Sequence, residues 1–275
     1  MSRSWIRPGS DVELDAAGRP RGELLRRVVE RPTVEVELLR LPGGAEAWWK
    51  RYCFPRAGQR WRSCLGHTGL GTPKVRREAR SLLRLEEAGV PAARALAWSL
   101  RRAFPGLVRD GGLLTATWDG ARTLEEQPGE VQDSIWLRIG ASLRRMHDAG
   151  CFHRRLAPRN LVLDQEVPDR PRLAWIDLDQ ALWRRRLPDA ARAWDLLAFV
   201  LPAPERFGVR AWTLLTRGYG RWEDAGPAEL RAALPGSWQR SLGRRLERER
   251  RRRVAERRTG AADALSPPGL PSEPR

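Results

Sequence analysis

Residues 153–163 read HRRLAPRNLVL and residues 175–179 read WIDLD, and these two stretches decide the fold of the second half of the chain. The apolar run that ends the first stretch predicts a short buried strand, and the apolar run that leads into the second predicts another. The segment between them is polar and contains two prolines, as expected of a hairpin connection. Such a hairpin would bring Asn160, just before the first strand, beside Asp177, just after the second.

Asn160 and Asp177 offer an amide oxygen and a carboxylate at the same end of the predicted hairpin. Mg²⁺ prefers oxygen ligands of this kind and usually completes its shell with water and phosphate oxygens. The pair therefore predicts a magnesium site that would serve a nucleotide such as ATP.

The same residues match part of the protein-kinase signature. In that signature an Asn follows a His by seven residues, and an Asp follows the next strand. His153, Asn160 and Asp177 fit this spacing, whereas Arg155 stands where the signature has an Asp that accepts the proton of the substrate hydroxyl. The match is therefore strong for the fold and weaker for activity.

A second pair is predicted upstream, between a strand and a helix. Residues 33–38 and 45–52 read as the two strands of a hairpin, and Lys50 lies on the second. The pattern of residues 73–88 predicts a helix, which places Glu78 on the face that carries its leucines. Because a carboxylate on an apolar face needs a cation, we expect Glu78 to pair with Lys50, as in kinases that hold ATP through a lysine.

Composition limits the class of protein without choosing a function. The chain has 275 residues, of which 41% are hydrophobic, enough for one large core or two modest lobes. The net charge of +17 favours a polyanionic partner, whether nucleic acid, an anionic membrane face or a phosphorylated substrate. Only Lys50 and Lys74 among the 51 basic residues are lysine, so a reason specific to an ammonium should be sought there.

Strands are concentrated in the first half of the chain and helices in the second. This predicts an α+β fold of two lobes rather than an alternating α/β sheet. Trp118-Asp119-Gly120 falls where a hinge between the lobes would receive the adenine. We divide the chain into four parts: an N-terminal extension, 1–24; a nucleotide-binding N-terminal lobe, 25–118; a C-terminal lobe with the catalytic loop and metal site, 119–239; and a basic helix with a disordered tail, 240–275.

The basic helix is predicted for residues 240–258, where ten arginines accompany three glutamates, and the proline-rich residues 259–275 are predicted to be disordered. The helix reads either as a solvated terminal helix or as a patch for an anionic membrane or another polyanion. The three cysteines show no paired spacing, and no signal peptide or spanning segment is predicted. These features predict a cytoplasmic protein, at most peripheral on the inner membrane.

With these residues in place, the chain resembles the lipopolysaccharide kinase (Kdo/WaaP) family, small bacterial relatives of protein kinases that phosphorylate sugars of the lipid A–core region. Besides the His153 loop, the resemblance is carried by WKRY at 49–52, GTPK at 71–74, GVP at 89–91, IDLD at 176–179 and AWDLL at 193–197. It implies a two-lobed protein-kinase-like fold, with an N-terminal antiparallel β-sheet plus one helix and a mostly helical C-terminal lobe.

The resemblance also implies ATP and Mg²⁺ as cofactors and assigns residues to them. Lys50 and Glu78 would fix the nucleotide, and Asn160 with Asp177 would hold the metal beside it. Asp195 would anchor the backbone of the catalytic loop.

The candidate catalytic residues are Arg155, Asp179 and His153. An arginine cannot deprotonate an alcohol at pH 7, and a general base typically contributes about 10²–10⁴-fold to the rate. Arg155 could instead pair with the γ-phosphate or a phosphorylated acceptor, leaving Asp179 or solvent to take the proton, or it could fill the acceptor site and abolish catalysis. Asp179 reads as a second metal contact or a loop hydrogen bond, and His153 as a histidine that packs the loop.

The leading hypothesis is an ATP-dependent phosphotransferase that acts on a sugar of the lipopolysaccharide core or a related envelope glycan, with a rate that Arg155 would lower. The basic helix would bring it to the anionic membrane surface and to a glycolipid substrate. The first alternative is an inactive pseudokinase that binds nucleotide and scaffolds a partner. The second is a polyanion-binding module that holds RNA, which ranks last because the chain shows no RNA-reading motif beyond charge.

Overall fold

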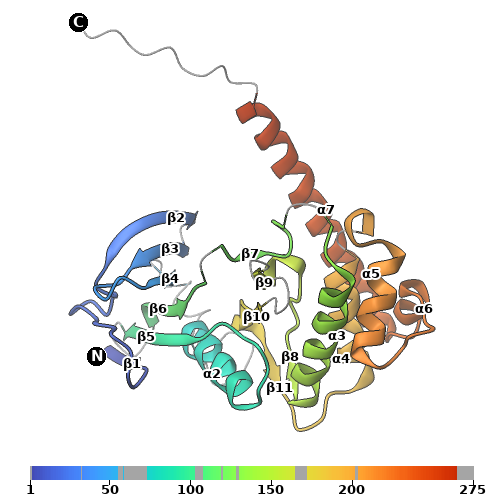
Figure 1. Cartoon of the computed structure of the whole chain (residues 1–275), viewed down its shortest axis with the longest axis horizontal. Coiled ribbons are helices and arrows are strands. Elements are labelled where there is room, and N and C mark those ends of the chain that lie inside the picture. Colours follow the sequence, from blue (N-terminus) through green and yellow to red (C-terminus); the bar gives the residue numbers. More distant parts are fainter. Residues whose placement is uncertain are drawn as a thin grey trace, which may run out of the picture.

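A computed structural model describes the chain over residues 2–31, 33–54, 58, 73–102, 108–118, 120–127, 130–164, 172–201 and 204–264. An antiparallel sheet with one packed helix forms the N-terminal lobe, and most of the remaining helices form the C-terminal lobe beside it (Figure 1). The predicted two-lobed α+β architecture is therefore confirmed.

The N-terminal lobe is built on a sheet of six of the described strands, in the order β1-β5-β6-β4-β3-β2, with neighbouring strands antiparallel. Its elements are β1 Ser2–Ile6, β2 Glu23–Arg31, β3 Val34–Arg40, β4 Glu46–Cys53, α2 Lys74–Glu87, β5 Ala95–Arg102 and β6 Val108–Ala116.

The C-terminal lobe combines short strands with helices. Its elements are β7 Arg122–Thr123, α3 Asp133–Asp148, β8 Cys151–Phe152, the 3₁₀-helix η1 Pro158–Asn160, β9 Leu161–Asp164, β10 Arg172–Trp175, the 3₁₀-helix η2 Leu178–Gln180, β11 Leu182–Trp183, α4 Asp189–Val200, α5 Pro204–Tyr219, α6 Pro227–Ala232 and α7 Gly236–Ala264.

Successive side chains of strand β4 point alternately to the two faces of the N-terminal sheet. Tyr52 packs with Ala79 and Leu82 of α2 on the inner face, which is the face that carries Lys50. Trp49 packs on the outer face with residues of the N-terminal segment. Lys50 thus points toward α2 and the second lobe, because it shares the face of Tyr52 while its neighbour Trp49 is buried on the opposite face.

Part of the predicted N-terminal extension, residues 1–24, packs with the N-terminal lobe. Strand β1 pairs with β5 at one edge of the sheet. Glu37 on the outer face is 1% exposed and forms ion pairs of 2.9 Å with Arg19 and with Arg27. Because a buried carboxylate needs its cations, the pair with Arg19 holds the N-terminal segment against the sheet.

Helix α2 ends where the sequence predicted, through a glycine cap. Gly89 adopts φ +66°, a backbone conformation that favours glycine, and the N–H of Val90 donates to the carbonyl of Leu85 at 2.8 Å. This turn sends the chain toward β5 and fixes the end of the helix that carries Glu78.

The hairpin that the opening motif predicted is present. Strands β9 and β10 are antiparallel, with Leu161 opposite Trp175 and Leu163 opposite Leu173. Trp175 is fully buried, and its indole N–H donates to the hydroxyl of Ser142 in α3 at 2.9 Å. The hairpin is thereby fixed against the C-terminal core.

Helix α7 differs from the prediction in length and in placement. It begins at Gly236 and extends to Ala264, so residues 259–264, which were predicted as part of the disordered tail, are helical. Its alanines at 261, 262 and 264 favour helix continuation. Leu242 is fully buried, so the first half of the helix belongs to the C-terminal core. Within the described part of the chain, no helix has the length and apolar character that crossing a bilayer requires.

Helices α3 and α5 cross at two glycines that allow the backbones to approach closely. A Cβ on Gly140 would lie 2.1 Å from the carbonyl oxygen of Leu215, and a Cβ on Gly218 would lie 2.1 Å from that of Leu137. Both contacts are too short for any side chain. This crossing sets the position of α3, which leads through β8 into residues 153–160, the loop predicted to be catalytic and called the catalytic loop below.

We predict that Gly140→Ala lowers the free energy of unfolding by about 1–3 kcal/mol, because the added methyl group would force the two helices apart. Gly243→Ala in α7 is the matched control, since its Cβ would have only the Arg231 side chain within 4 Å, at 3.8 Å. The control should be neutral or slightly stabilising through helix propensity. Urea denaturation of both variants measures the difference, and equal stability would contradict the tight crossing.

Candidate functional site

Lys50 lies between carboxylates that come from both lobes. Its Nζ is 3.1 Å from Oε1 of Glu78 in α2, and it also forms an ion pair with Oδ1 of Asp177, just after β10. Burial alone would lower the pKa of Lys50, but Glu78, Tyr52 and the aspartates beyond them raise it well above its ordinary value. The lysine is therefore a fixed positive charge at the junction of the lobes.

Glu78 is itself held in place by a second donor. Its side chain is buried, and its Oε2 accepts a hydrogen bond of 2.8 Å from the Tyr52 hydroxyl. Each carboxylate oxygen of Glu78 thus has one partner, which orients the group toward Lys50. The ion pair expected from the helix pattern is present, and the tyrosine that supports it comes from the same strand as the lysine.

Lys74, the other lysine of the chain, lies at the same site. Its Nζ is 3.5 Å from Oδ2 of Asp179 and 5.7 Å from the centre of the Tyr52 ring, while Lys50 lies 5.3 Å from that centre. Arg77 of α2 donates to the backbone carbonyl of Asp179. In a chain with 51 basic residues, both lysines therefore lie on one cluster of acids around Tyr52.

Asn160 and Asp177 meet at the end of the hairpin, as the spacing predicted. The N–H of Ile176 donates to the carbonyl of Asn160 at 3.0 Å, and both Asn160 and Asp177 line one cavity. Asp177 adopts φ +61°, a conformation that Asp tolerates better than most residues. Burial favours a higher pKa for Asp177, but the Lys50 ammonium outweighs it and lowers the pKa to about 2. Asp177 is therefore ionised at neutral pH.

The Asp195 side chain holds the catalytic loop by its backbone N–H groups. This carboxylate is fully buried in α4 and accepts hydrogen bonds from the N–H groups of His153, at 2.8 Å, and Arg154, at 3.0 Å. Arg154 has φ +67°, which a non-glycine residue adopts only when its surroundings hold it there. The anchoring role implied for Asp195 is confirmed by this geometry.

His147 supports Asp195 from behind. Its ring is fully buried between Asp195 Oδ2, at 3.3 Å from Nε2, and the Tyr219 hydroxyl, at 2.8 Å from Nδ1. Burial lowers the pKa of His147, although Asp195 opposes this effect. The neutral ring therefore donates to Asp195 and accepts from Tyr219.

His153 and Arg155 occupy different environments in the loop. His153 is fully buried, and its Nε2 donates to the carbonyl of Ile176 at 3.1 Å, which ties the loop to the residue before Asp177. Arg155 has an exposed side chain that borders the cavity, while its backbone carbonyl accepts from Nδ2 of Asn160 at 2.8 Å. The arginine side chain is thus free to face a ligand, and the loop keeps its shape through the main chain.

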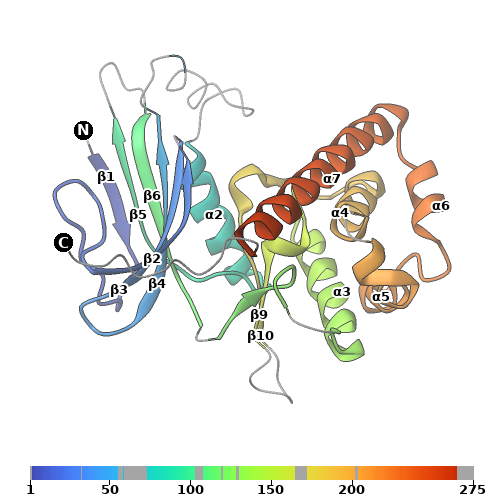
Figure 2. The ribbon, with the colours of Figure 1, turned by 90° about the horizontal axis from the view of Figure 1, so that it is seen from above.

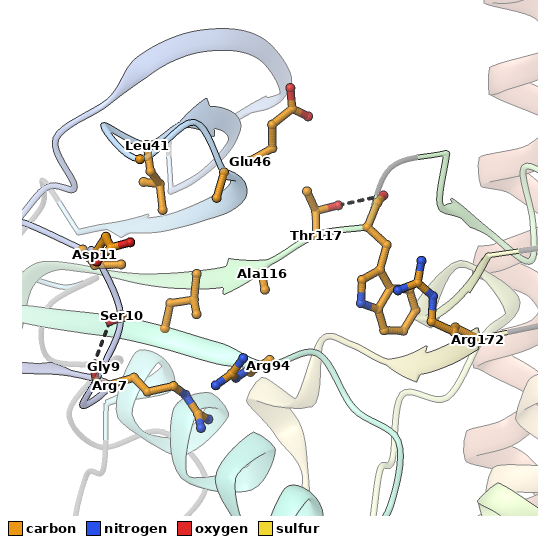
Figure 3. A pocket seen from close by; sticks show the side chains of 15 residues that line it. Arg7, Gly9, Ser10, Asp11, Leu41, Glu46, Arg94, Ala116, Thr117 and Arg172 are labelled. Carbon is orange, nitrogen blue, oxygen red and sulfur yellow. Dashed lines mark hydrogen bonds between the residues drawn. The ribbon is translucent and has the colours of Figure 1, made fainter. Parts of the chain in front are cut away.

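The cavity beside Asn160 and Asp177 has a volume of about 740 Å³ and lies between the catalytic loop and α7. A second cavity, of about 640 Å³, lies on the outer face of the N-terminal sheet near Ala116 and Thr117, with Arg7 and Arg94 on its wall (Figure 3). None of the candidate site residues lines that second cavity. Among these residues, Arg155, Asn160 and Asp177 line the first cavity.

The residues present fit a divalent cation bound together with a phosphate. Because Nδ2 of Asn160 is engaged with the loop, the Asn160 side chain has its amide oxygen to offer as a ligand. Oδ1 of Asp179 is buried and has no hydrogen-bond partner within the described residues. Within the described part of the chain, no group of three His, Cys, Asp or Glu side chains is placed to hold a metal ion without other ligands. A cation here would need phosphate oxygens and water to complete its shell.

The sequence missed some residues that shape the site. Lys74 had a usable signal, since lysine is rare in this chain, but its partner was not identifiable. His147 and Tyr219 meet only because α3 packs on α5. Arg245 of α7 donates to the carbonyls of Arg154, at 2.7 Å, and Leu156, and no local pattern pointed to that contact.

A two-lobed fold with a lysine–glutamate pair in one lobe and an Asn and Asp at the end of a hairpin in the other defines the protein-kinase-like class. Within that class, the chain belongs to the lipopolysaccharide kinase (Kdo/WaaP) family, whose model matches residues 48–219. It is 29% identical over 161 residues to the 3-deoxy-D-manno-octulosonic acid kinase of Actinobacillus succinogenes. That match covers 55% of this chain and 65% of the relative, so the chain spans slightly less than two thirds of that protein.

Solved structures agree on the fold. The structure of WaaP in complex with acyl carrier protein is similar with a TM-score of 0.55 and 22% identity, over 82% of this chain and 88% of that one. An aminoglycoside-3'-phosphotransferase of type VIII gives a TM-score of 0.50 and 17% identity, over 82% and 93%. At these identities the likeness establishes the protein-kinase-like architecture and nothing further.

The buried His147 predicts a pH dependence of stability. Because its pKa is lowered in the folded state, the unfolded chain takes up a proton as pH falls below about 6.5 while the folded chain does not. The contribution of His147 to the free energy of unfolding is complete above that pH. It is lost as pH falls toward the pKa of His147 in the folded state, by up to about 1.4 kcal/mol per pH unit. Urea unfolding between pH 7.5 and 5 should show this slope reduced in His147→Gln. An unchanged slope would contradict a neutral His147.

Proposed function

We propose that this chain is an ATP- and Mg²⁺-dependent phosphotransferase that acts on a sugar of the lipopolysaccharide core or a related envelope glycan. The observation that carries the proposal is the ammonium of Lys50, held between Glu78 of one lobe and Asp177 of the other, with Asp177 lining the cavity beside the loop. Family membership supports the phosphoryl chemistry, and the name of the kinase relative supports an acidic sugar as acceptor.

In this proposal the phosphate end of the nucleotide contacts both lobes. Lys50, oriented by Glu78, would bind the phosphates, and Asn160 with Asp177 would hold Mg²⁺. The metal would neutralise charge on the phosphates. Trp48 lies on the face of Lys50 and donates to the Thr117 hydroxyl at 3.1 Å, so its ring would form a wall of the adenine site near the hinge.

The reaction requires one bond to form and one to break. A hydroxyl oxygen of the sugar forms a bond to the γ-phosphorus as the bond from that phosphorus to the bridging oxygen breaks, giving a phosphorylated sugar and ADP. The hydroxyl proton passes to solvent, because Arg155 cannot accept it. Positioning and charge neutralisation supply most of the acceleration in such loose transition states, so loss of the base slows the reaction without abolishing it.

Asp179 has a supporting role in this proposal. Its carboxylate is buried beside Lys74 and does not line the cavity, which favours the second metal contact over the role of proton acceptor. His153 is assigned to the shape of the loop, since its ring nitrogen holds the carbonyl before Asp177.

Arg155 also favours a second candidate function, an inactive pseudokinase that binds nucleotide and scaffolds a partner. The two proposals share the nucleotide site and differ only in turnover. In both, the protein works in the cytoplasm, where ATP is available, and meets its glycolipid or partner at the anionic inner surface of the membrane.

Radiolabel transfer from ATP to core oligosaccharide tests the proposal. We expect Mg²⁺-dependent transfer that falls at least about 100-fold in Asp177→Ala, because both the metal ligand and the partner of Lys50 are lost. Asp224→Ala, at an exposed position of the same lobe, should transfer as the wild type does.

A thermal shift with ATP and Mg²⁺ separates the outcomes of that assay. Stabilisation by the nucleotide without any transfer would support the pseudokinase, and no stabilisation would contradict both candidates. ATP at a concentration of one hundred times its dissociation constant should raise the free energy of unfolding by about 2.7 kcal/mol.

A second test concerns Lys74. We predict that Lys74→Gln weakens ATP binding about tenfold, because the acids around Tyr52 would then repel the phosphates more strongly. Arg80→Gln removes a positive charge from an exposed position of the same helix and should change the affinity less than twofold. Calorimetric titration with ATP and Mg²⁺ measures both, and equal effects would reduce Lys74 to one more surface cation.

A further inference from the structure

The cavity beside Asp177 has one wall that comes from α7. This helix lies outside residues 48–219, which match the family model. It packs on α4 and runs toward the hairpin of β9 and β10 (Figure 2). Trp238, Ser241, Arg245 and Arg248 of α7 line the cavity. The terminal helix is thus part of the site.

Several contacts fix α7 against the catalytic loop. Arg245 donates to the carbonyls of Arg154 and Leu156. Arg159, at the start of the hairpin, forms an ion pair with Glu249. Because these contacts include backbone carbonyls of the loop, the wall has a defined position relative to Asn160 and Asp177. A solvated terminal helix would not make them.

The charge of this cavity is strongly positive. Two acids line it, and both are already paired, Asp177 with Lys50 and Glu249 with Arg159. Six arginines line it as well: Arg154, Arg155, Arg159, Arg184, Arg245 and Arg248. Arg155 and Arg248 are exposed, and within the described residues their side chains form no ion pair. Their guanidinium groups are therefore available to an anion in the cavity.

The remaining wall of the cavity is aromatic. The rings of Phe152 and Trp238 are stacked with centroids 5.9 Å apart, and Trp194 meets Trp238 edge-on at 5.7 Å. An aromatic surface beside a few convergent polar groups is typical of a small-molecule site, and a ring face can pack on the C–H groups of a sugar. The ligand that fits is a sugar ring that carries an anionic group.

We propose that the loop and α7 together form the acceptor pocket, in which Arg155 and Arg248 bind an anionic group already present on the acceptor beside the hydroxyl that is phosphorylated. This inference rests on the proposed function. Guanidinium groups bind carboxylate and phosphate alike in a bidentate manner, so the anionic group is either the carboxylate of an acidic sugar or a phosphate already attached. Arg155 is then a specificity residue in the place of the lost base.

Calorimetric binding of core oligosaccharide to the full chain tests this assignment. Arg248→Gln should weaken binding about tenfold, and Arg155→Gln similarly, because each loses a charge-assisted contact. Arg250→Gln is the matched control, since Arg250 is an exposed arginine of the same helix that does not line the cavity. It should change the affinity less than twofold. Thermal melts of the variants should match the wild type, because all three side chains are exposed.

Chemical forms of the probe identify the anion. The wild type is titrated with dephosphorylated oligosaccharide and with carboxyl-reduced oligosaccharide. One of these two forms lacks the group that the arginines bind. That form should bind the wild type as weakly as native oligosaccharide binds Arg248→Gln. Equal loss in Arg248→Gln and Arg250→Gln, or no loss in either, would overturn the pocket. If Arg248→Gln and Arg250→Gln both lost binding to anionic phospholipid vesicles and kept sugar binding, the arginines would be assigned to the membrane surface instead.

The sugar-binding readout also keeps this proposal separate from phosphoryl transfer. A chain that binds the anionic sugar through Arg248 but transfers no phosphate would retain the pocket and contradict the proposed activity. A chain that transfers phosphate equally well with Arg248→Gln would retain the activity and contradict the pocket.

Discussion

The position of the Lys50 ammonium is the constraint on which the rest of the site depends. It is held by Glu78 from the N-terminal lobe and by Asp177 from the C-terminal lobe, so one charge joins the two halves of the fold. Loss of Lys50 would leave the buried Glu78 carboxylate without its cation, and breaking a buried ion pair in this way typically costs about 3–5 kcal/mol. The alternation of β4, the cap of α2 and the register of the hairpin all serve to bring these three groups together.

A second node, Asp195, keeps the catalytic loop in shape independently of the chemistry that the loop performs. It binds the loop through backbone N–H groups, and Asn160 is held by the backbone carbonyl of Arg155. The side chain at position 155 contributes to none of these bonds. The side chain at position 155 can therefore be an arginine while Asn160 and Asp177 keep their places, which explains how the loop keeps its shape around this residue.

The basic C-terminal helix α7 has two parts in different surroundings, and its charge alone did not distinguish them. Its first half is part of the C-terminal core and contacts the catalytic loop, whereas its later residues extend away from the lobe (Figure 1). Arginines of one helix thus have different surroundings according to their position along it. Net charge predicted a polyanionic partner, and the packing of α7 directs part of that charge into a cavity beside Asp177.

The sequence by itself determined the hairpin that joins Asn160 to Asp177, the strand of Lys50, the helix of Glu78 and the two-lobed class, because each follows from local periodicity and from motifs with fixed spacing. Tertiary structure alone decided the contacts of His147 with Tyr219, of Lys74 with Asp179 and of Arg245 with the loop. These pairs lie far apart along the chain and carry no local pattern, since they arise from how helices pack on one another and on the loops of the C-terminal lobe. Periodicity shows which face of an element is buried, but only packing shows what lies against it.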